Sequence, residues 1–281
     1  MTVATLAKEN LLPIDQALPV SIVGLCLLYA FVIVYRRLLR GIQLRGGQVR
    51  SDLFGLPDTL VVLLLTVLVL LALVMQWLFP ATAAGRDAMK NATDVLLLSA
   101  PMILALIVVR GISFPVLFGL KRVGPLRALG TGAGLVVLLL PVIVIATIIS
   151  LQFLGSQASE QEAVKVFREV AKAGKPKAIW NAIISIAIVA PFLEEVLFRG
   201  YLYPVMKRSV GPLPAALAAA MIFGAVHNNA AGFPVLTVLA LALTLAYEWA
   251  GSILVPICMH MCFNAGNLAV MWWQATHGTR P

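Results

Sequence analysis

Long apolar stretches, separated by short polar segments, run through most of the chain. The stretch from Leu60 to Leu78 contains no charged residue and is long enough to cross the hydrocarbon core of a bilayer as a helix. It does not alternate between apolar and polar positions, as a membrane β-barrel strand would. The pattern predicts an all-α, polytopic membrane protein with about eight transmembrane helices. The expected spans are residues 18–35, 57–79, 93–118, 131–154, 178–206, 212–229, 234–248 and 252–274.

Composition supports this interpretation. Of 281 residues, 61% are hydrophobic and only 12% are charged, whereas about 25% of an average soluble domain is charged. The net charge of +9 does not indicate nucleic-acid binding, because the basic residues cluster in short loops beside the expected spans. We therefore expect the lipid bilayer, and no nucleic acid, among the partners.

The distribution of basic residues predicts an orientation. They follow the first, third and fifth expected spans, so these three loops lie on one side, which the positive-inside rule makes cytoplasmic. Both termini then face outward, in a multi-pass protein of the cell membrane. The basic residues concerned are Arg36, Arg37, Arg40, Arg45, Arg50, Lys121, Arg122, Arg127, Lys207 and Arg208.

The chain divides into three parts. Residues 1–156 form the N-terminal transmembrane helices and carry no diagnostic motif. Residues 157–177 are expected to form an amphipathic helix on the membrane surface, with Val166 and Phe167 on its apolar face; a solvated loop helix is the alternative. Residues 178–275 contain the polar motifs described next.

Three polar motifs interrupt the apolar spans of this last part. Ionisable groups inside a membrane are costly and usually mark a site of chemistry or transport. Together they offer carboxylates, imidazoles and an amide, which suffice to activate water and to stabilise an oxyanion. The motifs are Glu194-Glu195-x-x-x-Arg199, Phe223-x-x-x-His227 and His260-x-x-x-Asn264.

The first motif predicts two carboxylates with different roles. Glu195 and Arg199 are four residues apart and can form an ion pair on one helix face. Glu194 is rotated by about 100° from Glu195 and must face another neighbour, which suits a general base. A purely structural ion pair is the alternative for Glu195 and Arg199. Pro191, one turn before Glu194, is expected to leave a backbone carbonyl free near the site.

The depths of the three motifs can be compared from one membrane side, and helix tilt can absorb the differences between them. Glu194, His227 and His260 are each roughly 13–22 Å of helix away from the same membrane side, so we expect them to converge within the bilayer, accessible from the cytoplasm. His260 and Asn264 would present two donors to an oxyanion. Alternatively, they hydrogen bond between helices, where such a bond contributes about 1 kcal/mol.

Residues 178–270 resemble the CAAX-protease and bacteriocin-processing (CPBP) family of intramembrane endopeptidases, because all three motifs are intact and in order. The resemblance implies hydrolysis of a protein or peptide substrate at the membrane. It also implies three roles for the motif residues. Glu194 and His227 would activate water, His260 and Asn264 would form the oxyanion hole, and Glu195 and Arg199 would order the site.

Two questions stay open at this point. We favour a mechanism that requires no cofactor, because the chain has no His-Glu-x-x-His helix; the alternative is zinc held by Glu194, His227 and His260. The alternatives to a peptidase are a proton-coupled transporter that uses the same glutamate and histidines, and a non-catalytic membrane adaptor.

Overall fold

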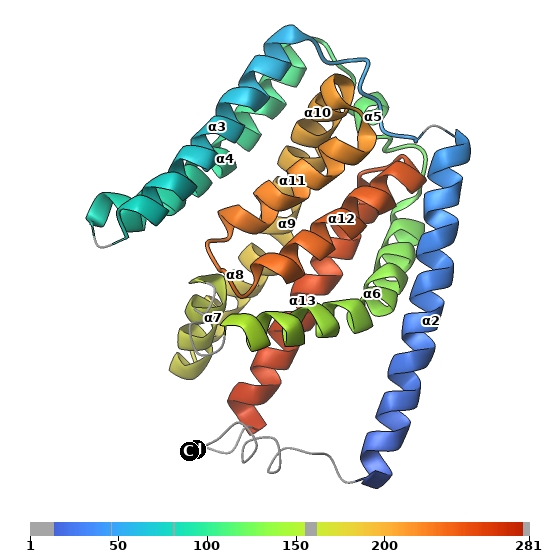
Figure 1. Ribbon diagram of the computed structural model, residues 1–281, viewed down its shortest axis with the longest axis vertical. Helices are drawn as coiled ribbons and strands as arrows, with labels where there is room; N and C mark the ends of the chain where they lie inside the picture. The colour runs from blue at the N-terminus through green and yellow to red at the C-terminus, as the bar shows by residue number, and fades with distance from the viewer. Residues whose placement is uncertain (1–13, 46, 81, 155–161, 278–281) are drawn as a thin grey trace.

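The computed structural model describes residues 14–45, 47–80, 82–154 and 162–277. These residues form helices joined by short loops, and none of them is in a β-strand, which confirms the all-α class. Residues 157–161 of the expected amphipathic segment lie outside the described residues. The helices are α2 (Ile14–Arg45), α3 (Leu56–Leu78), α4 (Ala83–Val109), α5 (Phe114–Leu117), α6 (Pro125–Leu154), α7 (Glu162–Ala173), α8 (Pro176–Ile184), α9 (Ala190–Leu197), α10 (Tyr203–Val210), α11 (Pro212–Val226), α12 (Phe233–Ala250) and α13 (Leu254–His277) (Figure 1).

Seven of the described helices are long and apolar enough to cross a membrane. One of them, Pro176–Val210, joins α8, α9 and α10 through two π-helical turns, η2 (Ser185–Val189) and η3 (Phe198–Leu202). The remaining expected span, the sixth at 212–229, corresponds to α11, which has only 15 residues. At about 1.5 Å per residue, α11 is roughly 22 Å long and ends inside the bundle. His227, the residue that follows this short helix, therefore lies within the bundle.

The third expected span, 93–118, is wrong at both ends. Helix α4 begins at Ala83, where the side chain of Thr82 accepts a hydrogen bond from the Gly85 amide and caps the helix. It ends at Val109, and the chain then turns through Gly111, which has a φ of +65°. Polar residues therefore occupy the first three turns of α4, and its apolar part begins at Val95.

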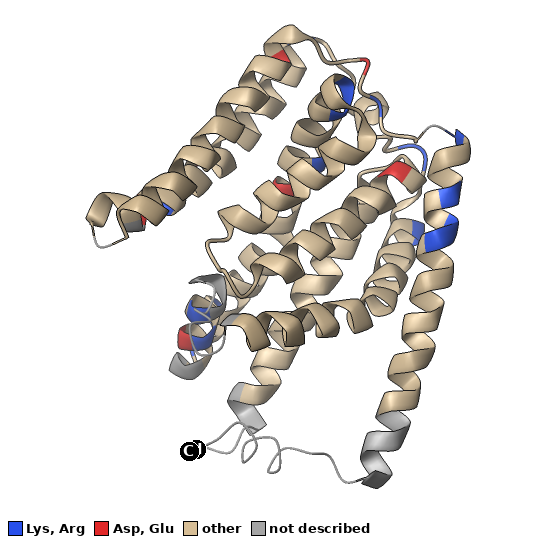
Figure 2. Ribbon diagram, in the orientation of Figure 1, with Lys and Arg blue, Asp and Glu red and all other residues tan. Residues whose placement is uncertain are grey.

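The three basic loops meet at one end of the molecule, as expected. The guanidinium of Arg122 donates to the Gln48 side chain at 2.7 Å, and the Lys207 ammonium donates to the Val49 carbonyl at 3.0 Å. We call this end, formed by residues 47–55, 118–124 and 207–211, the basic end. Helix α2 begins and α13 ends at the opposite end (Figures 1 and 2). That the basic end is cytoplasmic stays a prediction.

A buried glutamate, Glu248 near the end of α12, holds the basic end together. One carboxylate oxygen accepts from the Tyr203 hydroxyl and the Lys207 ammonium, both at 2.5 Å. The other accepts from the backbone amides of Gln48 and Val49, at 2.8 and 3.2 Å. This carboxylate thus joins α10, α12 and the α2–α3 loop.

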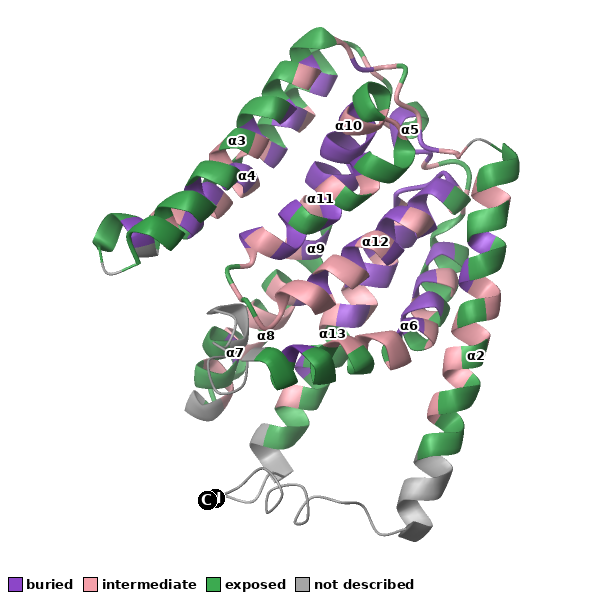
Figure 3. Cartoon of the chain, viewed as in Figure 1, coloured by how far each residue is buried: buried purple, intermediate pink, exposed green. Residues whose placement is uncertain are grey.

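Buried side chains concentrate on α9 to α13, whereas α2 and the α3–α4 hairpin at the two edges are largely exposed (Figure 3). The exposed side chains of these outer helices are mostly Leu and Val, as lipid contact requires. Close packing at the centre depends on Gly132 of α6, where a Cβ atom would lie 2.6 Å from the Met259 amide nitrogen. Of the three glycines near the start of α6, Gly132 therefore serves helix packing, whereas a Cβ atom at Gly130 or Gly134 would have no neighbour within 4 Å.

Helix α7 is amphipathic, and one aromatic residue attaches it to the bundle. Phe167 is only 1% exposed and packs with Ala187 and Leu268, whereas Val166 beside it is exposed. The buried face of α7 thus covers the outer ends of α8 and α13. Its location on the membrane surface stays a prediction.

Candidate active site

The helix that carries Glu194 and Glu195 changes its hydrogen-bonding register just before them. In η2 the Ala190 amide donates to the Ser185 carbonyl, five residues back. In the same register residue 191 would donate to the Ile186 carbonyl, but Pro191 has no N–H. The Ile186 carbonyl instead accepts from the Asn264 side-chain amide at 2.9 Å. The free carbonyl expected from Pro191 is confirmed, and it anchors α13 against α9.

Glu195 and Arg199 form the buried ion pair that their spacing predicts. Arg199 Nη1 lies 2.8 Å from Glu195 Oε1, and the two side chains are 2% and 0% exposed. Arg199 also donates to the Ala240 carbonyl at 3.0 Å. Glu195 Oε1 lies 2.9 Å from His260 Nδ1. The ion pair therefore fixes the His260 imidazole of α13 relative to α9 and α12.

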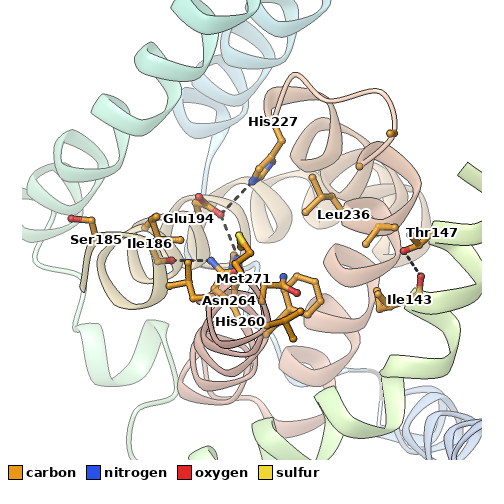
Figure 4. Close-up of a pocket in the computed structure, with 18 of the residues that line it drawn as sticks. Ile143, Thr147, Ser185, Ile186, Glu194, His227, Leu236, His260, Asn264 and Met271 are labelled. Atoms are coloured by element: carbon orange, nitrogen blue, oxygen red, sulfur yellow. Dashed lines mark hydrogen bonds and ion pairs between the residues drawn. The ribbon is translucent and has the colours of Figure 1, made fainter. Parts of the chain in front are cut away.

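Glu194 lies between the two histidines of the site (Figure 4). Its Oε2 atom is 4.0 Å from His227 Nε2 and 3.8 Å from His260 Nε2. Both distances are too long for direct hydrogen bonds. Oε2 is buried and has no hydrogen-bond partner among the described residues. A buried polar atom without a partner requires an explanation, and here it faces two ring nitrogens.

Both imidazoles are oriented through their other ring nitrogen. His227 Nδ1 lies 2.7 Å from the Phe223 carbonyl; a carbonyl only accepts, so Nδ1 carries the proton. The Nε2 lone pair of His227 then faces Glu194. The Phe223 ring packs against both imidazoles, at centroid distances of 4.7 Å from His227 and 5.7 Å from His260. The phenylalanine of the second motif therefore both orients His227 through its backbone and separates the rings.

The structure brings together all six site residues expected from the sequence, from α9, η3, α13 and the end of α11. The structure limits the role expected of Asn264. One of its two side-chain N–H groups donates to the Ile186 carbonyl, so only the second can reach a ligand. Their catalytic roles belong to the proposal below.

The three side chains named as a zinc set do not fit a metal ion in this arrangement. Tetrahedral ligands with bonds of about 2.1 Å lie roughly 3.4 Å apart, less than the separations of Glu194 Oε2 from the two Nε2 atoms. Among the described residues, no group of three His, Cys, Asp or Glu side chains is placed to hold a metal ion. We therefore derive no step through a metal.

A cavity of about 660 Å³ opens beside these residues. Glu194, His227, His260 and Asn264 form its polar wall, and much of the remaining wall is apolar (Figure 4). Helix α6 contains Pro141, bends, and runs its second half across the bundle (Figure 1), as an internal proline permits. This bend brings Ile143, Thr147 and Leu151 into the cavity wall.

The cavity lining bears on two sequence-based expectations. Residues 1–156 carry no diagnostic motif, yet α6 contributes to the wall of the cavity; Pro141 within an apolar span was the available signal. Access was expected from the basic end. The wall residues, however, come from the second half of α6, the α11–α12 loop and the later turns of α13. These segments lie away from the basic end, so the lining favours access from the opposite half.

Comparison with known proteins finds similarity in the part of the chain that holds these residues. Residues 176–266 match the family model described as type II CAAX prenyl endopeptidase Rce1-like. Over 88 residues the chain is 34% identical to the membrane-embedded CAAX protease MroQ of Staphylococcus aureus (strain USA300), covering 29% of this chain and 36% of that protein. Over 87 residues it is 33% identical to the uncharacterized protein YpbD of Bacillus subtilis (strain 168), covering 30% and 42% respectively.

The match is thus limited to the part of the chain that holds the site, and it spans less than half the length of either relative. No solved structure matches the chain. All three polar motifs lie inside the matched residues. The resemblance is confirmed for this part of the chain: residues 176–266 match the model of the type II CAAX prenyl endopeptidase Rce1-like family.

Proposed function

We propose that the protein is an intramembrane endopeptidase that hydrolyses a peptide bond with a water molecule activated by Glu194 and His227. The observation that carries the proposal is the Glu194 Oε2 atom. It is buried, lacks a hydrogen-bond partner among the described residues, and lies 4.0 and 3.8 Å from two oriented imidazole nitrogens, so that one water can hydrogen bond to the carboxylate and to a ring nitrogen. A carboxylate in this position can accept a proton from a bound water.

The proposed hydrolysis begins with the activation of a water molecule. Glu194 removes a proton from water while His227 Nε2 accepts a hydrogen bond from the second O–H and orients it. The water oxygen bonds to the peptide carbonyl carbon, and the carbonyl electron pair moves to its oxygen. When the tetrahedral intermediate collapses, the C–N bond breaks and the proton on Glu194 passes to the leaving amine. One water is consumed, and the carboxylate is restored.

The oxyanion of this intermediate would lie near the remaining N–H of Asn264 and His260 Nε2. His260 holds a proton on Nδ1 when it donates to Glu195, so it offers a donor at Nε2 only as an imidazolium. The Glu195 carboxylate lies 2.9 Å from His260 Nδ1 and orients the ring. Glu195 and Arg199 are therefore positioning residues, which act through His260.

The cavity favours an apolar peptide segment as the substrate. Besides the four catalytic side chains, its wall contains Ile143, Leu151, Val235, Phe263 and Met271. A peptide in an extended conformation is required, since the scissile carbonyl must reach Glu194 among closely packed helices. We therefore propose a protein or peptide substrate that reaches the site from the membrane.

Cleavage of a peptide library by the purified protein in liposomes tests the proposal. Wild type should release products, whereas Glu194→Gln and His227→Gln should not; Glu169→Gln, an exposed glutamate on α7, should behave as wild type. Equal cleavage by both site variants contradicts the mechanism. Metal analysis and chelation run in parallel, and activity that depends on bound zinc would replace the metal-free mechanism. Transport or adaptor function predicts no products at all.

A further inference from the structure

A second cavity, of about 490 Å³, lies on the other side of Glu194 and His227. It is enclosed by α4, α9, η3 and the end of α11, whereas the first cavity is enclosed by α6, η2, α9, α12 and α13. Glu194 and His227 belong to the wall of both. The two side chains proposed to activate water therefore form the partition between two spaces.

The second cavity reaches the polar beginning of α4. Lys90 and Asp94, both exposed, and the partly buried Thr93 form one side of it. The first three turns of α4 also contain Arg86 and Asp87, and charged residues appear at this end of the helix in Figure 2. Charges of both signs at the start of a span belong at the membrane–water interface. This side of the cavity thus meets the aqueous phase.

Hydrogen bonds fix this mouth next to His227. Thr93 Oγ1 donates to the Val226 carbonyl at 2.6 Å, and Gln76 donates to the Asn228 side chain at 2.8 Å. Asn228 also has a φ of +49°, which asparagine tolerates better than most residues. The residues on either side of His227 are therefore tied to α4 and α3, which keeps the cavity beside the imidazole.

The inner part of the cavity is apolar and lies against Glu194. Leu96, Leu97, Leu197 and Phe198 form it. A passage with a charged mouth and an apolar inner wall admits water but offers few partners to a peptide backbone. The first cavity, in contrast, is larger and provides Asn264 and His260 beside Glu194.

We propose that the second cavity supplies water to Glu194 while a peptide occupies the first. Each hydrolysis consumes one water, and a peptide seated against Glu194, His260 and Asn264 covers the carboxylate from that side. The water for the next reaction then has to reach Glu194 from the second cavity, on the side of α4. This inference rests on the proposed function, although the access of water to the cavity is measurable without any activity.

Two adjacent positions of α4 allow a matched labelling experiment. Leu97 lines the second cavity, whereas Leu98, at nearly the same depth, is 67% exposed on the outside of the bundle and faces lipid. We would place Leu97→Cys and Leu98→Cys separately in a background with Cys26, Cys258 and Cys262 replaced by serine. A charged, membrane-impermeant methanethiosulfonate reagent is then applied to the protein in liposomes.

Because only a hydrated thiol reacts with this reagent, we expect the Leu97→Cys protein to be modified at least about ten-fold faster than the Leu98→Cys protein. Equal, slow modification of both would show that the second cavity is dry and would overturn the proposal. This measurement does not depend on peptidase activity, so it separates a failure of the water route from a failure of the proposed function.

The modified protein provides the kinetic test, since the blocking group is added after folding. Modification of Leu97→Cys should lower kcat by about ten-fold or more and leave KM nearly unchanged, because water supply and not peptide binding is affected. Val235→Trp, which narrows the first cavity, should instead raise KM. If modification at position 97 raises KM and leaves kcat unchanged, the second cavity holds part of the peptide, and the water route is wrong. Activity of the unmodified Leu97→Cys protein tests the proposed function itself.

Discussion

Two glutamates inside this helical bundle, Glu248 and Glu194, have opposite environments. Each oxygen of Glu248 accepts two hydrogen bonds at the basic end, from Tyr203, Lys207 and the amides of residues 48 and 49. Glu194 is 15% exposed at a cavity, and its Oε2 atom has no hydrogen-bond partner among the described residues. Both carboxylates are costly to place in a membrane protein, but only that of Glu248 is fully compensated.

This difference distinguishes the structural carboxylate of Glu248 from the Glu194 carboxylate, which we propose to be reactive. A buried carboxylate whose acceptor positions are all occupied contributes to the fold and cannot take a proton from a ligand without losing a bond. A carboxylate with an open acceptor position, next to two oriented imidazoles, can do so. Glu195, although adjacent to Glu194, is assigned a positioning role because its Oε1 contacts Arg199 and His260. Its Oε2, like that of Glu194, has no hydrogen-bond partner among the described residues, but Glu195 lines neither cavity.

The largest effect is expected from Glu194→Gln. Removing the proposed base should lower kcat/KM by about 10²- to 10⁴-fold, while the thermal unfolding midpoint stays close to that of wild type, since the substituted oxygen has no partner to lose. Peptide cleavage and thermal unfolding in detergent measure the two quantities. If Glu194→Gln were much less stable but fully active per folded molecule, Glu194 would have the structural role that we assign to Glu248.

The next largest effect concerns the Glu195–Arg199 ion pair. Arg199→Met leaves a buried carboxylate unpaired and should lower the free energy of unfolding by about 3–5 kcal/mol. The double variant Glu195→Met with Arg199→Met removes both charges and should recover much of that stability. It should nevertheless stay inactive, because His260 loses the carboxylate that orients it. Recovery of activity in the double variant would show that the pair is only structural.

A smaller effect is expected from Glu248→Gln at the basic end. The amide cannot accept all the bonds that the carboxylate accepts, so the free energy of unfolding should fall by about 1–3 kcal/mol. The rate of cleavage per folded molecule should not change, because Glu248 lies in neither cavity wall. Loss of kcat at unchanged stability would contradict this structural role.

The smallest effect is expected from Arg110→Met. Arg110 pairs with Asp58 at 2.6 Å, but its side chain is 34% exposed, and partly exposed pairs contribute about 0–1 kcal/mol. Asp58 also keeps its bonds from the Gly55 amide and the Tyr201 hydroxyl. Unfolding should therefore shift by no more than about 1 kcal/mol, with cleavage unchanged. If Arg110→Met lowered the free energy of unfolding as much as Arg199→Met does, the burial of the arginine would not determine how much each ion pair stabilises the protein.

Much of the site was predictable because its residues lie in short motifs on helices. Spacing of four residues brings Glu195 beside Arg199, and the rotation of about 100° per residue turns Glu194 away from them. Pro191 predicted a free carbonyl, although not that Asn264 would bind it. The role of Glu248 was not predictable, since its partners at residues 48, 49, 203 and 207 are remote in sequence.

The sequence by itself determined the helical membrane class, most of the spans and the six residues of the candidate site, because hydrophobic length and helical periodicity are local properties. Only the tertiary structure decided which carboxylate is saturated and which is open, how α6 bends into the cavity wall, and that Glu194 and His227 separate two cavities. These features depend on distances between helices, and the packing that sets such distances is a property of the whole bundle and not of any one segment.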